Sequence, residues 1–217
     1  MLSKVLSSAV IGIDAYSVEV EVDITRGLPR FNIVGLPETA VKESRERVKA
    51  AIKNSGYELP DDHITVNLAP AHIKKEGTGF DLPIALGILG ATRILARESL
   101  DACLCLGELS LDGRIKPVFG SLPAAIAARD AGHKAIVVPY ENRKEAAVVE
   151  GISLILRTTC PRWLNSSEAN WPFKQKRSIS PGLLRATPPL RKTSPMSRGR
   201  STPSGQWKLP PPGATTC

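Results

Sequence analysis

Alternating apolar and polar positions open the chain and predict β-strands. Apolar residues take every second position, and acidic or polar side chains take the positions between them. Each such run should therefore have one buried and one solvated face. The apolar positions are Val18, Val20, Val22 and Ile24 in the first run, Phe31, Ile33 and Val34 after a turn at Gly27 and Pro29, and Ile64, Val66 and Leu68 in the run that starts at His63.

A helical period replaces this alternation from about Thr39 to Ser55, and Gly56 predicts the left-handed residue that closes the helix. One face of this helix is apolar and the other is charged, so the helix should lie against a core. Oppositely charged side chains four residues apart are expected to pair on the outer face. The apolar stripe is Val41, Val48 and Ile52, and the expected ion pairs are Lys42–Glu46 and Glu43–Arg47.

The rest of the pattern completes an α/β order. A segment from about Leu82 to Ala96 is apolar nearly all round, which predicts a helix inside the domain. Further elements follow in sequence, each marked by turn residues. They are a hairpin from Cys103 to Ile115 with its turn at Asp112–Gly113, a helix capped by Ser121 and ended by Gly132, a strand over Ala135–Pro139 buried on both faces, and a last helix from about Asn142 to Glu150.

Net charge divides the chain into two compositions. The whole chain carries +8, but residues 153–217 hold 11 Lys and Arg against one acid, Glu168, and residues 1–152 carry −2. We therefore predict one α/β domain over residues 1–152 and a basic, proline-rich, disordered tail over residues 153–217. The near-neutral domain is not predicted to bind nucleic acid generally, because the basic surplus belongs to the tail.

The start of the chain indicates where the protein works. Met1-Leu-Ser-Lys enters a β pattern directly, without the features of a secretory leader. No apolar run approaches the roughly 18 residues of a membrane span. The four cysteines are too few and too scattered for a secreted disulfide framework. We expect a cytoplasmic protein with no membrane partner.

Common catalytic and metal-binding motifs are missing from the sequence. There is no GxxxxGK[ST] phosphate loop, so no nucleotide cofactor is predicted for this chain. Cys103 and Cys105 should share one strand face, but the three histidines show no ligand spacing to them. Buried cysteines that act as small apolar residues explain this pair best, and we predict no metal site.

The segment from Lys74 to Asp81 is the candidate binding loop. Its lysines, Lys74 and Lys75, add positive charge, and its glycines, Gly77 and Gly79, bring backbone N–H groups close to an approaching ligand. A helix starts directly afterwards, which favours an anion. A turn that simply requires positive φ explains the glycines equally well.

Two segments resemble the proteolytic domain of Lon-type proteases. Lys75-Glu-Gly-Thr-Gly-Phe-Asp-Leu-Pro-Ile-Ala is similar to that family's Lys-Asp-Gly-Pro-Ser-Ala-Gly loop, and Leu106-Gly-Glu-Leu-Ser-Leu-Asp-Gly-Arg is similar to its Gly-Glu-Ile-Ser-Leu-Arg-Gly-Arg hairpin. The family uses a serine nucleophile and a lysine base. On this chain the serine position falls on Gly79 and the lysine position on Leu122. The resemblance therefore implies the fold without proteolysis, and we predict no catalytic residues.

A longer resemblance covers residues 1–152. Gly12-Ile-Asp-Ala, Gly27-Leu-Pro-Arg-Phe-Asn-Ile-Val-Gly-Leu-Pro and Val66-Asn-Leu-Ala-Pro-Ala are similar to the N-terminal domain of ComM/YifB-type, magnesium-chelatase-like AAA+ ATPases. This implies a single Lon-like (ribosomal-protein-type) α/β domain with a mixed sheet and about four helices. Intact members of the family are implied to use ATP and Mg²⁺, to form homo-oligomeric rings, and to move branched DNA in transformation and recombination.

The tail departs from this family, whose ATPase should begin soon after residue 152. Reverse translation in a shifted frame lets Thr159–Ser167 encode Leu-Pro-Glu-Val-Val-Glu-Phe-Leu, which is the family's continuation, and Gly205–Cys217 encode a stretch like that before its phosphate loop. We predict a frameshift between about Ser153 and Thr158. The alternative is a genuine basic tail that makes the chain a stand-alone nucleic-acid-binding module.

Overall fold

The computed structural model describes residues 1–95 and 103–159 of the 217-residue chain. Strands and helices alternate here as a mixed α/β fold with four α-helices, as predicted. The strands are β1 (Leu2–Ile11), β2 (Asp14–Thr25), β3 (Arg30–Val34), β4 (His63–Ala69), β5 (Cys103–Cys105), β6 (Glu108–Leu109), β7 (Ile115–Lys116), β8 (Ala135–Pro139) and β9 (Ser153–Arg157). The helices are α1 (Thr39–Asn54), α2 (Asp81–Ala91), α3 (Ser121–Asp130), the 3₁₀ helix η2 (Tyr140–Asn142) and α4 (Arg143–Ala146).

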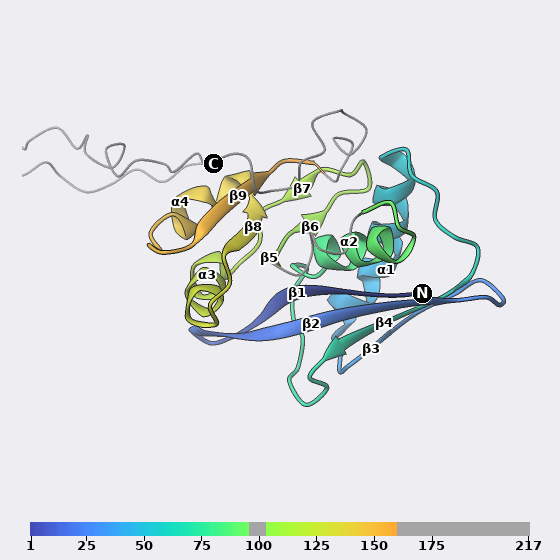
Figure 1. The fold of residues 1–217 in the computed structure, drawn as a ribbon, viewed down its shortest axis with the longest axis horizontal. Coiled ribbons are helices and arrows are strands. Elements are labelled where there is room, and N and C mark those ends of the chain that lie inside the picture. Colours follow the sequence, from blue (N-terminus) through green and yellow to red (C-terminus); the bar gives the residue numbers. More distant parts are fainter. Residues whose placement is uncertain (96–102, 160–217) are drawn as a thin grey trace, which may run out of the picture. The chain divides into compact units, whose positions relative to one another are not determined.

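Seven strands form one sheet in the order β3-β4-β2-β1-β5-β8-β9 (Figure 1). β1, β2 and β4 pair antiparallel, whereas β3 is parallel to β4. On the other side of β1, β5, β8 and β9 add in parallel. The sheet is therefore mixed, which confirms the predicted fold class.

Opposite faces of the sheet are covered by different helices. Because successive strand residues point to opposite faces, Cys103 and Cys105 contribute to one hydrophobic cluster and Leu104 to another. The first cluster includes residues of α1 and α2, and the second includes alanines of α3 and α4. The strand Ala135–Pro139 is buried throughout, as predicted for a strand with both faces covered.

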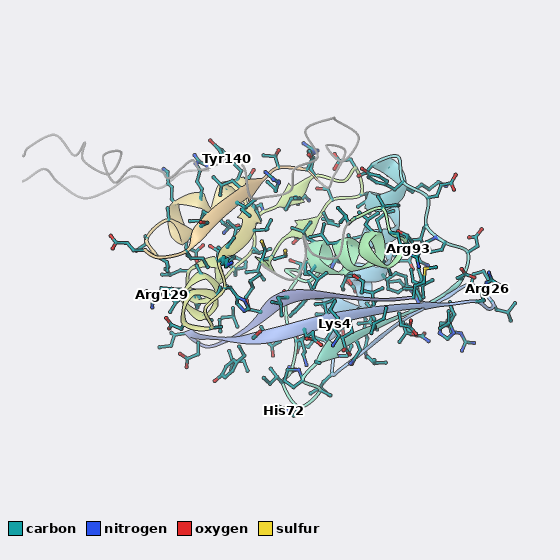
Figure 2. All side chains as sticks on the ribbon, in the orientation of Figure 1. Lys4, Arg26, His72, Arg93, Arg129 and Tyr140 are labelled. Atoms are coloured by element: carbon teal, nitrogen blue, oxygen red, sulfur yellow. The ribbon has the colours of Figure 1, made fainter. Side chains whose placement is uncertain are left out.

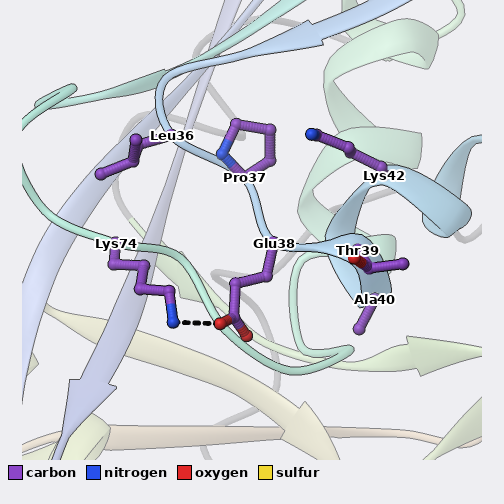
Figure 3. A pocket seen from close by; sticks show the side chains of 7 residues that line it. All are labelled: Leu36, Pro37, Glu38, Thr39, Ala40, Lys42 and Lys74. Atoms are coloured by element: carbon purple, nitrogen blue, oxygen red, sulfur yellow. Dashed lines mark ion pairs between the residues drawn. The ribbon is translucent and has the colours of Figure 1, made fainter.

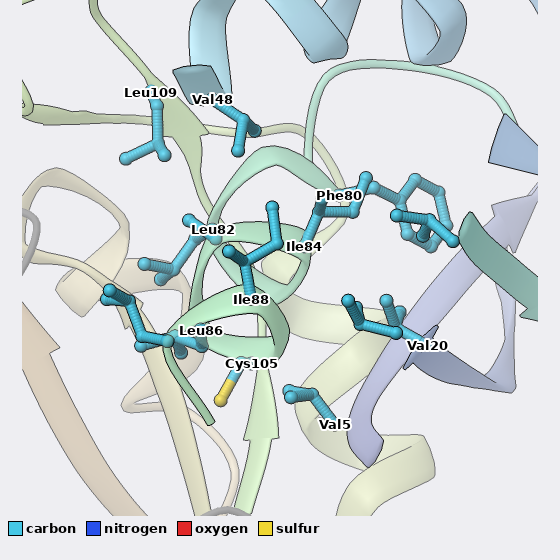
Figure 4. Close-up of a cluster of buried hydrophobic side chains, with 14 of the residues drawn as sticks. Val5, Val20, Val48, Phe80, Leu82, Ile84, Leu86, Ile88, Cys105 and Leu109 are labelled. Carbon is cyan, nitrogen blue, oxygen red and sulfur yellow. The ribbon is translucent and has the colours of Figure 1, made fainter. Parts of the chain in front are cut away.

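Helix α2 lies at the centre of the first cluster, and all of its residues are buried. Figure 4 shows its side chains between α1, the β1–β2 ribbon and β5, where Leu82, Ile84, Leu86 and Ile88 meet Val5, Val20, Val48 and Cys105. This confirms the prediction from its all-round apolar sequence. Burying a side chain such as Leu or Ile contributes about 1.5–3 kcal/mol, so α2 is a major source of stability.

The outer face of β1, β2 and β4 is polar, as their alternation predicts. Lys4 Nζ contacts Glu19 Oε1 at 2.6 Å and Glu21 Oε1 at 2.9 Å, and Asn67 Nδ2 donates to Glu21 Oε2 at 2.8 Å. Lys4 lies in the middle of this face in Figure 2. Its ammonium and the two carboxylates are exposed enough that they add little stability.

Several local predictions were wrong. Cys103–Cys105 is not a hairpin arm, because β5 takes β1 and β8 as parallel partners, and the hairpin is the short β6–β7 pair around the turn at Gly113. Ser121 does not cap α3, since its hydroxyl donates to Glu145. The N-cap residue is Gly120, which has φ of 80°. The last helix is shorter than predicted, as η2 and α4 end at Ala146.

The boundary at residue 152 also falls too early. β9 pairs with β8 over Ser153–Arg157, so the sheet continues five residues into the segment predicted to be disordered. The apolar residues Leu154, Ile155 and Leu156 pack against the two clusters, which explains why the strand forms. Residues 160–217, and with them most of the predicted tail, lie outside the described residues, and the frameshift stays a prediction.

The predicted pairs Lys42–Glu46 and Glu43–Arg47 are replaced by others. Glu46 contacts Arg45 and Lys49, and Arg47 reaches across to Asp81. The buried stripe of Val41, Val48 and Ile52 is confirmed. In the part of the chain that the structure describes, no helix is long and apolar enough to cross a bilayer.

Gly87 lets α2 approach the β1–β2 ribbon closely, and this gives a first prediction. A Cβ at Gly87 would lie 2.5 Å from Val22 Cγ2 and 3.7 Å from Val5 Cγ2. We expect Gly87→Ala to lower the free energy of unfolding by about 1–3 kcal/mol through overpacking, despite alanine's better helix propensity. Chemical denaturation measures this.

Gly27→Ala is the matched control, because a Cβ there would meet only His63 Cβ at 3.9 Å. Combining Gly87→Ala with Val22→Ala should recover part of the loss. Equal stability of the two single variants would contradict the close packing of α2 on β2.

Candidate functional site

Lys74 and Lys75 begin the candidate loop, and the structure separates them. Lys74 is exposed and forms ion pairs with Glu38 and, at 2.9 Å, with Glu76. Hydrogen bonds to these two carboxylates raise the pKa of Lys74. Figure 3 shows the Lys74–Glu38 pair beside the start of α1. The charge of Lys74 is therefore already balanced within the protein.

Lys75 is fully buried, which the sequence did not predict. Its ammonium donates to the carbonyl oxygen of Pro70, and burial lowers its pKa. Its backbone N–H donates to Leu36 O at 3.3 Å, and its carbonyl accepts from Glu38 N at 3.1 Å. Lys75 thus joins the loop to the segment between β3 and α1, and its side chain is not presented to a ligand.

The glycines of the loop have different roles. Gly77 is exposed and has φ of 79°, which is the left-handed conformation that the turn alternative requires. Gly79 is half-buried, and its carbonyl accepts from Gly107 N at 3.0 Å. Thr78 Oγ1 donates to Glu108 Oε2 at 2.5 Å. The loop is therefore bound to the Gly107–Glu108 segment. The sequence analysis had named these two segments as separate Lon-like motifs and had not predicted that they are in contact.

The first turn of α2, which follows the loop, offers little to an anion. Asp81 N donates to Thr78 O at 3.2 Å, and Leu82 N donates to Gly107 O at 3.0 Å. The carboxylate of Asp81 lies in this first turn and is fully buried. A triphosphate does not fit a helix start whose N–H groups are bonded and whose nearest charge is negative. The geometry favours the turn over the phosphate loop.

Asp81 is held by a buried ion pair with Arg47 of α1. Arg47 Nε lies 2.6 Å from Oδ2 and Nη2 lies 3.0 Å from Oδ1, while Leu109 N donates to Oδ2 at 3.1 Å. Burial raises the pKa of Asp81 against the effect of these donors, and the hydrogen bonds to Asp81 raise the pKa of Arg47. The pair joins α1, α2 and β6, and sequence spacing gave no signal for it.

Gly79 and Leu122, the two positions that the sequence resemblance assigns to the protease dyad, border the same hydrophobic cluster. A Cβ at Gly79 would lie 3.7 Å from Leu106 Cδ2 and 3.9 Å from Val118 Cγ1, so a side chain has room there. Leu122 in α3 packs against the cluster that contains Leu106 and Val118. The fold therefore places two positions 43 residues apart in the sequence beside one cluster, and neither glycine nor leucine has a group that can attack or transfer a proton.

A polar network holds the start of α3 next to Leu122. Glu145 accepts from Ser121 Oγ at 2.5 Å and from Leu122 N at 3.1 Å, and Asn142 Nδ2 donates to it at 3.2 Å. Partial burial acts to raise the pKa of Glu145, but these three donors outweigh it and the pKa is lowered. The network is satisfied internally and anchors a helix.

Metal chemistry has no candidate in the described residues. Residues 1–95 and 103–159 contain no cluster of three His, Cys, Asp or Glu side chains that could hold a metal ion. Cys103 and Cys105 are buried free thiols, and burial raises the pKa of Cys103 to about 11 and that of Cys105 further. Neither is a thiolate near neutral pH, so neither is a ready ligand or nucleophile.

A shallow cavity of 380 Å³ lies where β3 leads into α1. The sequence analysis named the motif that contains Leu36 and Pro37 and the loop that contains Lys74, but it did not show that these segments meet. Figure 3 shows its lining. The lining residues are Leu36, Pro37, Glu38, Thr39, Ala40, Lys42 and Lys74.

The sheet and its helices define a Lon-like, mixed α/β domain. Residues 20–142 match the family model described as subunit ChlI of Mg-chelatase, and the chain belongs to this family. It is 46% identical over 150 residues to the uncharacterized protein YifB of Escherichia coli (69% of this chain, 29% of the relative) and 42% identical over 148 residues to the competence protein ComM of Haemophilus influenzae (68% and 29%). Lon protease 2 of Bacillus subtilis is 29% identical over 175 residues (73% and 31%).

These matches confirm both resemblances. The chain spans about 30% of the length of the curated relatives it matches.

Replacing Arg47 tests the central ion pair. We expect Arg47→Met to lower the free energy of unfolding by about 3 kcal/mol, because it leaves the buried carboxylate of Asp81 with only the Leu109 N–H donor. Urea denaturation measures the loss. Arg45→Met is the control on the same helix, since Arg45 is exposed and pairs only with Glu46 among the contacts described, and it should change stability by less than about 1 kcal/mol.

Asp81→Leu combined with Arg47→Met should be milder than Arg47→Met alone, since no charge then stays buried. If Arg47→Met were no more damaging than Arg45→Met, the pair would not hold α1 to α2.

Proposed function

We propose that residues 1–159 form a non-catalytic domain of a ComM/YifB-type, magnesium-chelatase-like ATPase. The proposal rests on Gly79 and Leu122, to which the sequence resemblance assigns the Lon-type serine and lysine positions. Both residues border the second hydrophobic cluster, and neither carries a nucleophile or a base. The internally satisfied hydrogen bonds around Lys75, Asp81 and Glu145 support a bracing role. The domain then acts through contacts and not through chemistry.

The motor role belongs to the intact family members. In our proposal these proteins form cytoplasmic homo-oligomeric rings that use ATP and Mg²⁺ to migrate branched DNA in transformation and recombination. The name of the competence protein ComM, to which this chain is similar, agrees with such a role. The nucleotide would bind in the ATPase region, since the described loop and helix start do not suit a triphosphate.

A chimera tests this proposal. We expect that residues 1–157 of this chain, put in place of the matching N-terminal region of Haemophilus influenzae ComM, support ATP-dependent branch migration on a synthetic Holliday junction within about threefold of the parent. Gly79→Ala in the chimera should leave the rate unchanged, because the side chain has room and no catalytic role.

A chimera that folds and hydrolyses ATP but moves no DNA would contradict the bracing role. Casein cleavage by the full chain would show instead that the domain is a peptidase and that Gly79 and Leu122 do not stand at its catalytic positions.

The basic surplus of residues 153–217 favours a second candidate, a stand-alone nucleic-acid-binding module. We expect this candidate to show duplex binding that weakens steeply between 50 and 200 mM salt, because each phosphate contact releases counterions. A chain that ends at Thr159 should then lose this binding, as measured by fluorescence anisotropy. Equal duplex binding by both chains would show that the tail does not contribute to binding. DNA sequencing around codon 155 would decide whether the tail is translated from a shifted frame.

A further inference from the structure

β3 is an edge strand of the seven-stranded sheet, with β4 as its strand partner (Figure 1). Arg30 N donates to Asp62 O, directly before β4, at 3.4 Å. In the parallel register, Arg30 stands opposite His63 and Asn32 opposite Thr65, so the even-numbered residues of β3 bond toward β4. Because the bonding direction alternates along a strand in a parallel pair, the N–H and C=O groups of Phe31 and Ile33 point to the free edge.

In the described part of the chain, no other strand pairs with this edge. The turn and loop hydrogen bonds within residues 1–95 and 103–159 include none to the backbone of Phe31 or Ile33. Val34 is 45% exposed, so its neighbourhood is open to solvent. Natural proteins normally cover or charge such an edge. An extended segment of another chain can supply hydrogen-bond partners for the backbone N–H and C=O groups of Phe31 and Ile33.

Basic side chains of α1 lie beside the edge. Lys42, Arg45, Lys49 and Lys53 are spaced three or four residues apart, which places them on one side of the helix. We call these four residues the basic stripe. Lys49 Nζ lies 5.7 Å from the centre of the Phe31 ring, so the stripe is next to β3. Glu46 contacts Arg45 and Lys49 and balances one of the four charges.

Charge is concentrated in this part of the domain. Residues 26–53 hold seven basic and three acidic side chains, a balance of +4. The rest of residues 1–152 holds 11 basic and 17 acidic side chains, a balance of −6. Arg30 on β3 and Arg26 in the preceding turn, which Figure 2 shows at the far end of β2, add to the positive side. A second copy of β3 would bring like charges together, so self-pairing is disfavoured.

We propose that the β3 edge binds an extended acidic peptide segment of a protein partner by strand addition. The peptide backbone pairs with the free groups of Phe31 and Ile33, its acidic side chains face the basic stripe, and its small apolar side chains lie against Val34. A peptide is favoured over nucleic acid, because its backbone can form hydrogen bonds with the free groups of the edge. Nucleic acid would contact the basic stripe alone. The free edge does not depend on the motor role, so failure of the ComM chimera leaves this site unaffected.

The probe is the synthetic peptide Val-Glu-Val-Glu-Val-Asp with blocked ends, titrated into the full ¹⁵N-labelled chain. We expect the amide signals of Phe31 and Ile33 to shift and to become protected from hydrogen exchange. Val-Lys-Val-Lys-Val-Lys, with the same alternation and the opposite charge, should cause neither change.

Two substitutions separate backbone from charge. Ile33→Pro removes an outward-facing N–H, together with part of the packing of Ile33 against the first cluster. It should weaken peptide binding about tenfold, since an edge position tolerates proline. Lys49→Glu should weaken binding by a similar factor. Lys144→Glu, on the exposed side of α4, is the charge control and should leave the affinity unchanged.

Three outcomes would overturn the proposal. Equal binding of the lysine peptide would remove the charge argument. A ten-base-pair DNA duplex that shifts the basic stripe, with no response to the acidic peptide, would make this a nucleic-acid surface. Self-association of the chain that Ile33→Pro abolishes would show that the edge pairs with a second copy. If Ile33→Pro does not fold, the Phe31 and Ile33 amide shifts and Lys49→Glu decide the question.

Discussion

The carboxylate of Asp81 carries a charge in the interior of the domain, and the arrangement around it depends on this charge. It has no exposed surface, and its three donors are Arg47 Nε, Arg47 Nη2 and Leu109 N. Losing any of them leaves negative charge in a medium where it is poorly solvated. α1, α2 and β6 must therefore keep their relative positions, and the loop before Asp81 is fixed with them.

Under our proposal, this constraint explains how the surroundings of Gly79 and Leu122 keep a Lon-like shape without a serine and a lysine. The loop through Gly79 is bonded to Gly107, and α3 is held by Glu145 through Ser121 and the Leu122 N–H. These contacts use backbone groups and buried polar side chains and need neither a serine nor a lysine. Leu122 instead adds apolar contacts to the second cluster. Catalytic residues can thus be replaced while their surroundings remain.

Features with a local period could be predicted from the sequence, and features set by distant partners could not. The stripe of Val41, Val48 and Ile52 and the buried α2 follow from hydrophobic spacing. The predicted partner of Arg47 was Glu43, four residues away in the sequence. Its observed partner is the buried Asp81, 34 residues away in the sequence, which attracts the guanidinium more strongly. β5 was taken for a hairpin arm because an apolar run does not reveal its parallel partners. The burial of Lys75 depends on two loops that meet only in the fold.

The two sides of α1 have different electrostatic roles, and the ion pair on one side fixes the position of the charges on the other. Arg47 is directed to the interior pair, while the basic stripe lies on the side next to β3. Because Arg47 fixes the rotation of α1, the stripe is held at a constant position relative to the free edge. A binding surface that is rigid before its partner arrives avoids much of the ordering cost of association. The buried pair that stabilises the fold therefore also preorganises the surface where we infer that an acidic strand binds.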